Sequence, residues 1–120
     1  MGNHYKKGHL CEKWAMIALM LKGYIPIGLN VITKRGTGAG EIDLVMKKGK
    51  TLVFIEVKKR PSYTKGLEAI TIDNQMRVVR ASAAFLKNNP LFQSYHIRYD
   101  AVICVPWRWP KHLKDAWRVL

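Results

Sequence analysis

The sequence predicts an α/β domain in which helices flank a mixed β-sheet. Three observations predict it: apolar residues at helical spacing near the start, a strand–turn–strand pattern in the middle, and an alternating strand after a second helical pattern. The chain has 120 residues, 48% hydrophobic and 24% charged, which fits a folded domain and argues against disorder. We expect one domain over residues 1–120, with a Trp-rich basic tail over residues 106–120 packed on it.

The first predicted helix covers residues 8–22. Its apolar stripe repeats at three- and four-residue spacing: Leu10, Trp14, Ile17 and Leu21. Gly23 is the predicted stop. Glu12 lies on the opposite face, beside Met16 and Leu19, so one carboxylate is set among apolar residues.

A strand is predicted next, over residues 24–34, with an interruption near Pro26 and Gly28. Residues 35–40 are predicted as a glycine-rich loop, and residues 61–66 as a second loop.

The clearest pattern in the middle of the chain is a β-hairpin with strands over residues 41–46 and 52–58. Residues directly opposite each other on paired strands share a face. A four-residue loop would therefore place Asp43 directly opposite Glu56.

The second half of the chain predicts helix, strand and helix. Thr71 is the expected N-cap of a helix that runs to about Asn88. Residues 96–105 alternate as a strand, and a short helix is expected from Pro110 to about Trp117. The predicted order of elements is α-β-β-β-α-β-α.

The middle helix also contains a polar residue on its apolar face. That face comprises Ile72, Val78, Val79, Phe85 and Leu86, with Gln75 in the middle of it. The opposite side is basic and is interpreted as a solvated face: Arg77, Arg80 and Lys87.

The charge of the chain indicates a polyanionic partner. Lys and Arg number 21 against 8 Asp and Glu, a net charge of +13, which favours nucleic acid or an anionic membrane surface. The longest apolar run, residues 14–21, is far shorter than the roughly 20 residues of a spanning helix. We therefore expect nucleic acid and no membrane. Cys11 and Cys104 form no disulfide framework, which favours a cytoplasmic protein, and the histidines have no zinc-ligand spacing.

Acidic residues are few, and three of the eight fall in the hairpin: Glu41, Asp43 and Glu56. Glu56 stands inside an apolar strand, where burial of a charge is costly unless the charge is paired or coordinates a metal. One interpretation is a structural ion pair with Lys58. The other is a divalent-metal site, because two carboxylates and a backbone carbonyl suit Mg²⁺. Lys58 would then hold or activate the attacking water in phosphodiester hydrolysis.

Two motifs carry a resemblance to known proteins. The GEIDLV run at residues 40–45 and the Glu56-Val57-Lys58 triplet resemble the PD-(D/E)xK nuclease core, in the form seen in archaeal Holliday-junction resolvases. From about residue 8 to 105 the chain more closely resembles the YraN-like family of bacterial proteins. The shared features are GEIDL, the FxEVKxR run, a glutamate on an early helix, a glutamine on the later helix, and a final strand with an Arg-x-Asp pattern.

The resemblance implies a restriction-endonuclease-like fold that uses Mg²⁺ or Mn²⁺ to cut DNA in repair or recombination. The implied metal ligands are the side chains of Asp43, Glu56 and Glu12 and the backbone of Val57. Lys58 would be the catalytic lysine, and Gln75 the helix residue that leans toward the site. Glu41 is left open between a second acid near the metal and a solvated residue at the strand end.

Basic and aromatic residues extend this hypothesis to the nucleic acid. Residues expected to flank the site and contact phosphates are Lys47, Lys48, Lys50, Lys59, Arg60 and Lys65. Trp107, Trp109 and Trp117 could stack on exposed bases, although packing against the sheet is the favoured interpretation.

The leading hypothesis is a metal-dependent, endonuclease-like protein that binds nucleic acid, most simply DNA. Cutting of two strands would favour a homodimer. Two alternatives remain: a nucleic-acid-binding module that keeps the fold without turnover, and an assembly protein whose basic surface binds an acidic protein.

Overall fold

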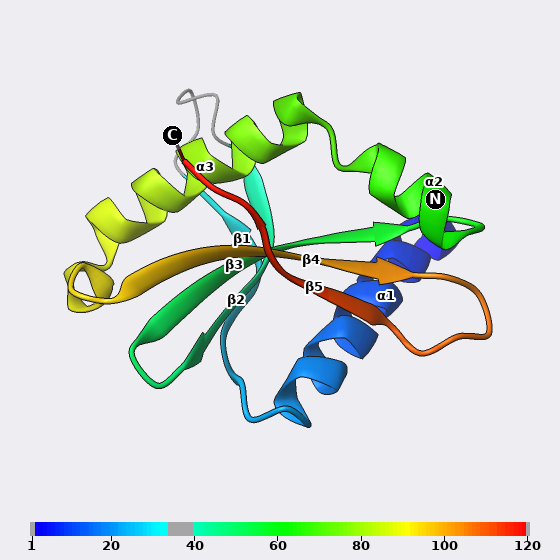
Figure 1. Cartoon of the computed structure of the whole chain (residues 1–120), viewed down its shortest axis with the longest axis horizontal. Helices are drawn as coiled ribbons and strands as arrows, with labels where there is room; N and C mark the ends of the chain where they lie inside the picture. Colours follow the sequence, from blue (N-terminus) through cyan, green and yellow to red (C-terminus); the bar gives the residue numbers. More distant parts are fainter. Residues whose placement is uncertain (1, 34–39, 120) are drawn as a thin grey trace.

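The computed structural model describes residues 2–33 and 40–119 and has the predicted α/β architecture, with one five-stranded mixed β-sheet between helices (Figure 1). The glycine-rich loop predicted before Gly40 lies outside the described residues. The elements are α1 (Gly2–Met20), β1 (Ile25–Ile32), β2 (Glu41–Lys48), β3 (Thr51–Lys59), α2 (Tyr63–Ala69), α3 (Ile72–Asn88), the 3-10 turn η1 (Pro90–Phe92), β4 (His96–Cys104) and β5 (Lys111–Trp117). None of the described helices is long and apolar enough to cross a membrane.

The strands lie in the order β1-β2-β3-β4-β5, and every neighbouring pair is antiparallel except β3 and β4, which are parallel. A parallel pair requires a crossover, and α2 and α3 supply it on one face of the sheet (Figure 1). The opposite face packs against α1 through Ala15 and Leu19, which contact Leu44 and Ile55 in one apolar cluster. Two cores therefore sandwich the sheet.

The hairpin forms in the predicted register. Lys48 pairs with Thr51, and the ladder continues to Leu44 and Ile55, so the turn contains two residues and not four. Both loop lengths are even and have the same centre, so the next opposed pair is Asp43 and Glu56 in either case.

Helix α1 begins before the predicted residue 8 and packs by its second apolar side. Ala15 and Leu19 are fully buried, and Glu12 lies at the edge of this buried face. The stripe of Leu10, Trp14, Ile17 and Leu21 is exposed. The small side chain of Ala15 gives the helix close access to the sheet, which brings Glu12 toward β2.

Helix α3 forms where expected. The Thr71 hydroxyl accepts a hydrogen bond from the Asn74 backbone at 3.2 Å, as an N-cap should. Its buried face is centred on Val78, Ala81 and Phe85, so Ile72 at its start stays 74% exposed.

Two elements differ from the sequence expectation. The loop predicted over residues 61–66 contains the start of α2, because the Ser62 hydroxyl caps it by accepting from the Lys65 backbone at 3.2 Å. The helix predicted from Pro110 is wrong, because Lys111–Trp117 forms β5 on the edge of β4. The open edge of β4 offers backbone hydrogen bonds that outweigh a weak helical pattern.

The tryptophans of the C-terminal segment divide between core and surface. Trp117 is buried and stacks on Tyr99, with ring centroids 5.8 Å apart. Trp109 is 58% exposed and Trp107 is fully exposed, so the favoured packing interpretation is wrong for these two.

Candidate functional site

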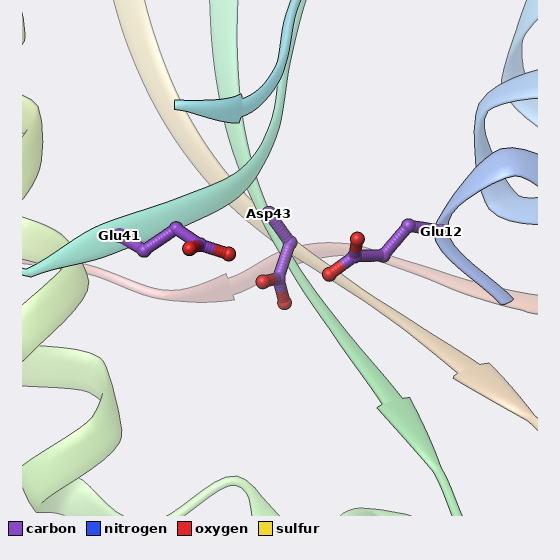
Figure 2. A group of neighbouring side chains, drawn as sticks. All are labelled: Glu12, Glu41 and Asp43. Atoms are coloured by element: carbon purple, nitrogen blue, oxygen red, sulfur yellow. The ribbon is translucent and has the colours of Figure 1, made fainter. Parts of the chain in front are cut away.

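Three carboxylates converge where α1 meets the start of β2. Glu12, Glu41 and Asp43 each place an oxygen within 4.8 Å of the other two, and Asp43 lies between the two glutamates in Figure 2. The period of two along β2 puts Glu41 and Asp43 on one side of the strand, and the packing of α1 supplies Glu12. Glu41, which the sequence left open, therefore belongs to this acidic cluster.

Asp43 is held in place by the neighbouring strand. The Val57 N–H donates a 2.8 Å hydrogen bond to Oδ2 of Asp43, just beyond the last ladder pair of Leu44 and Ile55. The N–H and C=O of one residue in an extended strand point to the same side. We therefore expect the Val57 carbonyl on the Asp43 side as well, which is where its predicted role as a ligand requires it.

Glu56 is the acid most affected by its surroundings. Burial raises the pKa of Glu56 to about 9, and the hydrogen bond and negative charge of Asp43 act in the same direction. The charges of Lys58 and Arg77 oppose this shift in pKa without cancelling it. Glu56 therefore keeps its proton at neutral pH when no cation is bound.

Glu12 shows the same behaviour from the other side of the cluster. Burial raises the pKa of Glu12 to about 8, with the charge of Asp43 as the next cause, while a hydrogen bond from Asn30 lowers it. Its Oε1 atom is buried and has no hydrogen-bond partner among the described residues. Buried carboxylates of this kind are stabilised by a cation, and a set of oxygen donors fits Mg²⁺ or Mn²⁺.

Lys58 and Arg77 are the cations that act on Glu56. Lys58 follows Glu56 by two residues on β3, so the two side chains share a face. Arg77 reaches over from α3, and its side chain also lies above Gly40, where an added Cβ would meet Cδ of Arg77 at 3.4 Å. The helical pattern alone places Arg77 on a solvated face, because it does not show that this face turns toward β2.

Gln75 has a different environment from the one expected. Its amide Nε2 donates to the Ile70 carbonyl at 3.4 Å, and its side chain lines a cavity of about 490 Å³ together with His112 and Leu113. The structure thus places Gln75 over β5, while Arg77 of the same helix acts electrostatically on Glu56.

The basic residues predicted to contact phosphates lie in three places: the end of β3, the hairpin tip and, for Lys65 alone, α2. Lys59 is the last residue of β3, directly after Lys58, and Arg60 follows the strand. The tip residues Lys47, Lys48 and Lys50 lie at the other end of the hairpin, four to six strand positions or about 13–20 Å from Asp43. The sequence predicts that the tip flanks the acids. In the structure the tip does not flank them.

Aromatic rings hold the lysines of the tip. The ammonium of Lys50 lies 4.9 Å and that of Lys47 5.9 Å from the ring centre of Tyr95. Lys48 lies 5.1 Å from the ring centre of Tyr24. On α2, Lys65 pairs with Glu68 at 3.7 Å with both side chains well exposed.

A second polar cluster, which sequence analysis noted only as a family pattern, lies between β4 and β5. Asp100 is fully buried and accepts two 2.8 Å hydrogen bonds from Arg98, one of 2.7 Å involving His112 Nε2, and one of 2.9 Å from the Asp115 N–H. Burial alone would raise the pKa of Asp100, but the hydrogen bonds from His112 and Arg98 hold it below its usual value. This fully satisfied network fixes β5 to the sheet.

The fold and the site define an α/β protein with an acidic centre assembled from a helix and a β-hairpin. Residues 11–104 match the family described as "Uncharacterised protein family UPF0102", and the chain belongs to this family. That result confirms the YraN-like resemblance.

Curated relatives extend this match along nearly the whole chain. The UPF0102 protein amb4503 of Paramagnetospirillum magneticum is 40% identical over 114 residues, covering 95% of this chain and 88% of the relative. A UPF0102 protein of Parvibaculum lavamentivorans is 43% identical over 115 residues, covering 95% and 83%. Another, of Sinorhizobium medicae, is 38% identical over 111 residues, covering 92% and 88%.

Proposed function

We propose that this protein is a metal-dependent endonuclease that hydrolyses phosphodiester bonds in nucleic acid, with DNA as its substrate. The observation that carries the proposal is the acidic cluster of Glu12, Glu41 and Asp43, to which Glu56 is joined by its hydrogen bond with Asp43 beside the charge of Lys58. Two of these acids have strongly raised pKa values, and one has a buried oxygen without a partner among the described residues. A purely structural ion pair of Lys58 with one acid would not account for four carboxyl groups gathered at one place: Glu12, Glu41, Asp43 and Glu56.

The residues of the acidic centre have separate tasks in this proposal. Asp43, Glu56, Glu12 and the Val57 carbonyl would hold Mg²⁺ or Mn²⁺, which supplies Lewis-acid activation of a phosphoryl oxygen and a water of lowered pKa. The Val57 N–H keeps the Asp43 carboxylate in one orientation. Lys58 orients the attacking water and stabilises the negative charge that develops on the phosphoryl group.

The substrate class follows from the charge of the chain. A net charge of +13 on 120 residues attracts a polyanion, and the phosphates of nucleic acid are the polyanion that this chemistry cleaves. Lys59 and Arg60 directly follow Lys58 in the chain and would contact phosphates beside the scissile one. Cleavage of both strands of a duplex would need two copies of the chain.

A metal-titrated cleavage screen over linear, flapped and four-way DNA tests the proposal. We expect cleavage with Mg²⁺ or Mn²⁺, none with EDTA, and none for Asp43→Asn, whose side chain nearly conserves shape. DNA binding that Asp43→Asn leaves intact, without cleavage by either protein, would instead indicate a nucleic-acid-binding module. Absence of both cleavage and DNA binding would favour an acidic protein as the partner of the basic surface.

A further inference from the structure

A pocket of about 580 Å³ opens between α1 and the segment that joins β4 to β5. Three of the four tryptophans of the chain line it: Trp14, Trp107 and Trp109. The remaining described lining is apolar except for two cations, Lys59 and Arg108, and it contains no carboxylate. The pocket therefore combines flat aromatic surfaces with positive charge.

The tryptophan side chains that line this pocket are exposed to solvent. Trp107 is fully exposed, Trp109 is 58% exposed and Trp14 is 48% exposed. Trp107 also has a φ of +65°, in the left-handed region that large side chains rarely adopt. Strained backbone of this kind concentrates at binding sites, and here it presents an indole to solvent at the rim of a pocket.

Charge and shape together indicate the ligand. An apolar protein segment could pack on the aromatic rings, but it would offer no anionic group to Lys59 and Arg108. A nucleotide satisfies both, because its base stacks on indole rings and its phosphate pairs with the cations. The pocket is also of the size that small ligands occupy.

The pocket is joined to the acidic centre through two elements. Cys11 lines the pocket and directly precedes Glu12 on α1, while Lys59 lines it and directly follows Lys58 on β3. Neighbouring residues on a strand lie about 3.8 Å apart with side chains on opposite faces. A nucleic acid strand with one phosphate at Lys58 thus passes around the end of β3 to reach the pocket.

We propose that this pocket binds an unpaired nucleobase next to the phosphate that is cut. The proposal deepens, and rests on, the proposed nuclease function. A base inside a duplex is stacked and paired and has to leave the helix to enter such a pocket. The substrate is therefore nucleic acid with unpaired bases close to the cut, such as a flap or a gap, and intact duplex is a poor substrate.

Binding of short single strands tests the pocket separately from cleavage. The probes are a fluorescently labelled oligothymidine and an abasic oligonucleotide of equal length, which has the same phosphates and no bases. Binding is measured in EDTA, so that no cleavage occurs. We expect the wild-type protein to bind oligothymidine about tenfold or more tightly than the abasic strand, because base–aromatic stacking strengthens binding at each base that is held.

Trp107→Ala and Trp109→Ala should remove this preference while leaving the affinity for the abasic strand unchanged. Both residues are exposed, so the variants should keep the unfolding temperature of the wild type. Leu91→Ala is the matched control, because Leu91 is a 76% exposed apolar residue on η1, outside the pocket. It should bind both strands as the wild type does.

The outcomes separate the pocket from the enzyme. A Trp107-dependent preference for bases in a protein that never cleaves DNA would support the pocket and overturn the nuclease. Cleavage that prefers intact duplex, or equal binding of both strands by all variants, would overturn the pocket alone. A dimer of the wild type that Trp107→Ala converts to monomer, with no effect on base preference, would assign the pocket to a second copy of the chain and also overturn the proposal.

Discussion

The backbone N–H of Val57 donates a hydrogen bond of 2.8 Å to Oδ2 of Asp43, joining β3 to the acid of β2 just where their ladder of backbone pairs ends. The bond restricts the Asp43 carboxylate to one orientation and sets it beside Glu56. The acidic centre therefore lies where the backbone pairing of β2 with β3 ends and a side chain of β2 accepts a hydrogen bond from the backbone of β3.

Replacing Asp43 by Ala should lower the affinity for Mn²⁺ and abolish cleavage. DNA affinity should stay the same or increase, because a negative charge is removed from a surface that faces phosphates. Metal affinity is measured by calorimetry and cleavage on gels, with the unfolding temperature as a control for folding. Unchanged metal affinity in this variant would contradict the role of Asp43 as a ligand.

Lys58→Ala should separate metal binding from chemistry. The acids remain, so Mn²⁺ should still bind, while the cleavage rate falls by about 10²–10³ through loss of transition-state stabilisation. Lys59→Ala is the matched control on the same strand and should weaken DNA binding with a much smaller change in the maximal rate. Equal rate losses for the two lysines would show that Lys58 acts only on binding.

The metal-free protein should lose stability as the pH rises. The pKa of Glu56 is raised from 4.5 to about 9, so its contribution to folding is complete below pH 4.5 and disappears progressively as the pH rises toward 9. Glu56→Gln removes this titration and should stabilise the protein at pH 8 by on the order of 2 kcal/mol. Unfolding temperatures measured in EDTA from pH 5 to 9 would show a fall for the wild type and a flatter curve for the variant.

Added Mn²⁺ should reverse that destabilisation at pH 8, because the cation takes the place of the proton. The gain should be absent in Asp43→Ala. A wild-type curve that is flat from pH 5 to 9 would show that Glu56 is far better solvated than the structure indicates.

The buried network between β4 and β5 should be essential for stability. Asp100→Asn breaks the pair with Arg98 and the bond to His112, and should cost about 3 kcal/mol. Because the pKa of Asp100 lies below its usual value, this stabilisation is complete above about pH 4 and disappears as the pH falls further. Chemical denaturation at pH 7 measures the destabilisation, and Glu68→Gln, in an exposed pair, should change little.

The lysines of the hairpin tip should act on binding and not on the chemical step. Alanine at Lys47, Lys48 and Lys50 should weaken binding to all sequences alike and flatten the dependence on salt, by a slope of about 0.9 for each phosphate that is no longer neutralised. The rate at saturating substrate should not change, because the tip lies about 13–20 Å along the hairpin from Asp43. A weakening confined to one particular sequence would point to base recognition by the tip.

Much of this fold follows from local patterns in the sequence. The alternation along residues 41–58 predicts the hairpin and the opposition of Asp43 and Glu56. Side chains alternate with a period of two, so a turn with an even number of residues puts both acids on the same face. Thr71 similarly marks the start of α3. Glu56 can be recognised because a carboxylate in an apolar strand is costly to bury unless it is paired or binds a metal.

The remaining features depend on distant contacts. Residues 111–117 become a strand because β4 offers an open edge, and the sequence of that segment does not reveal the edge. The same limitation applies to Arg77, which acts on Glu56 because α3 packs against β2 and β3. The limitation also applies to Trp107, which was expected to pack against the sheet and is exposed to solvent.

The parallel pairing of β3 and β4 has a consequence for the order in which the protein assembles. A ribosome delivers residues 12–58, with all the acids of the centre, well before residues 96–104 emerge to cover the second edge of β3. Until then, one edge of the apolar strand β3 has backbone N–H and C=O groups without strand partners. The pairing with β4 that satisfies them joins segments separated in the sequence by α2 and α3. Folding of this domain is consequently completed late, by a long-range encounter, and a truncation before β4 should leave a polypeptide that aggregates.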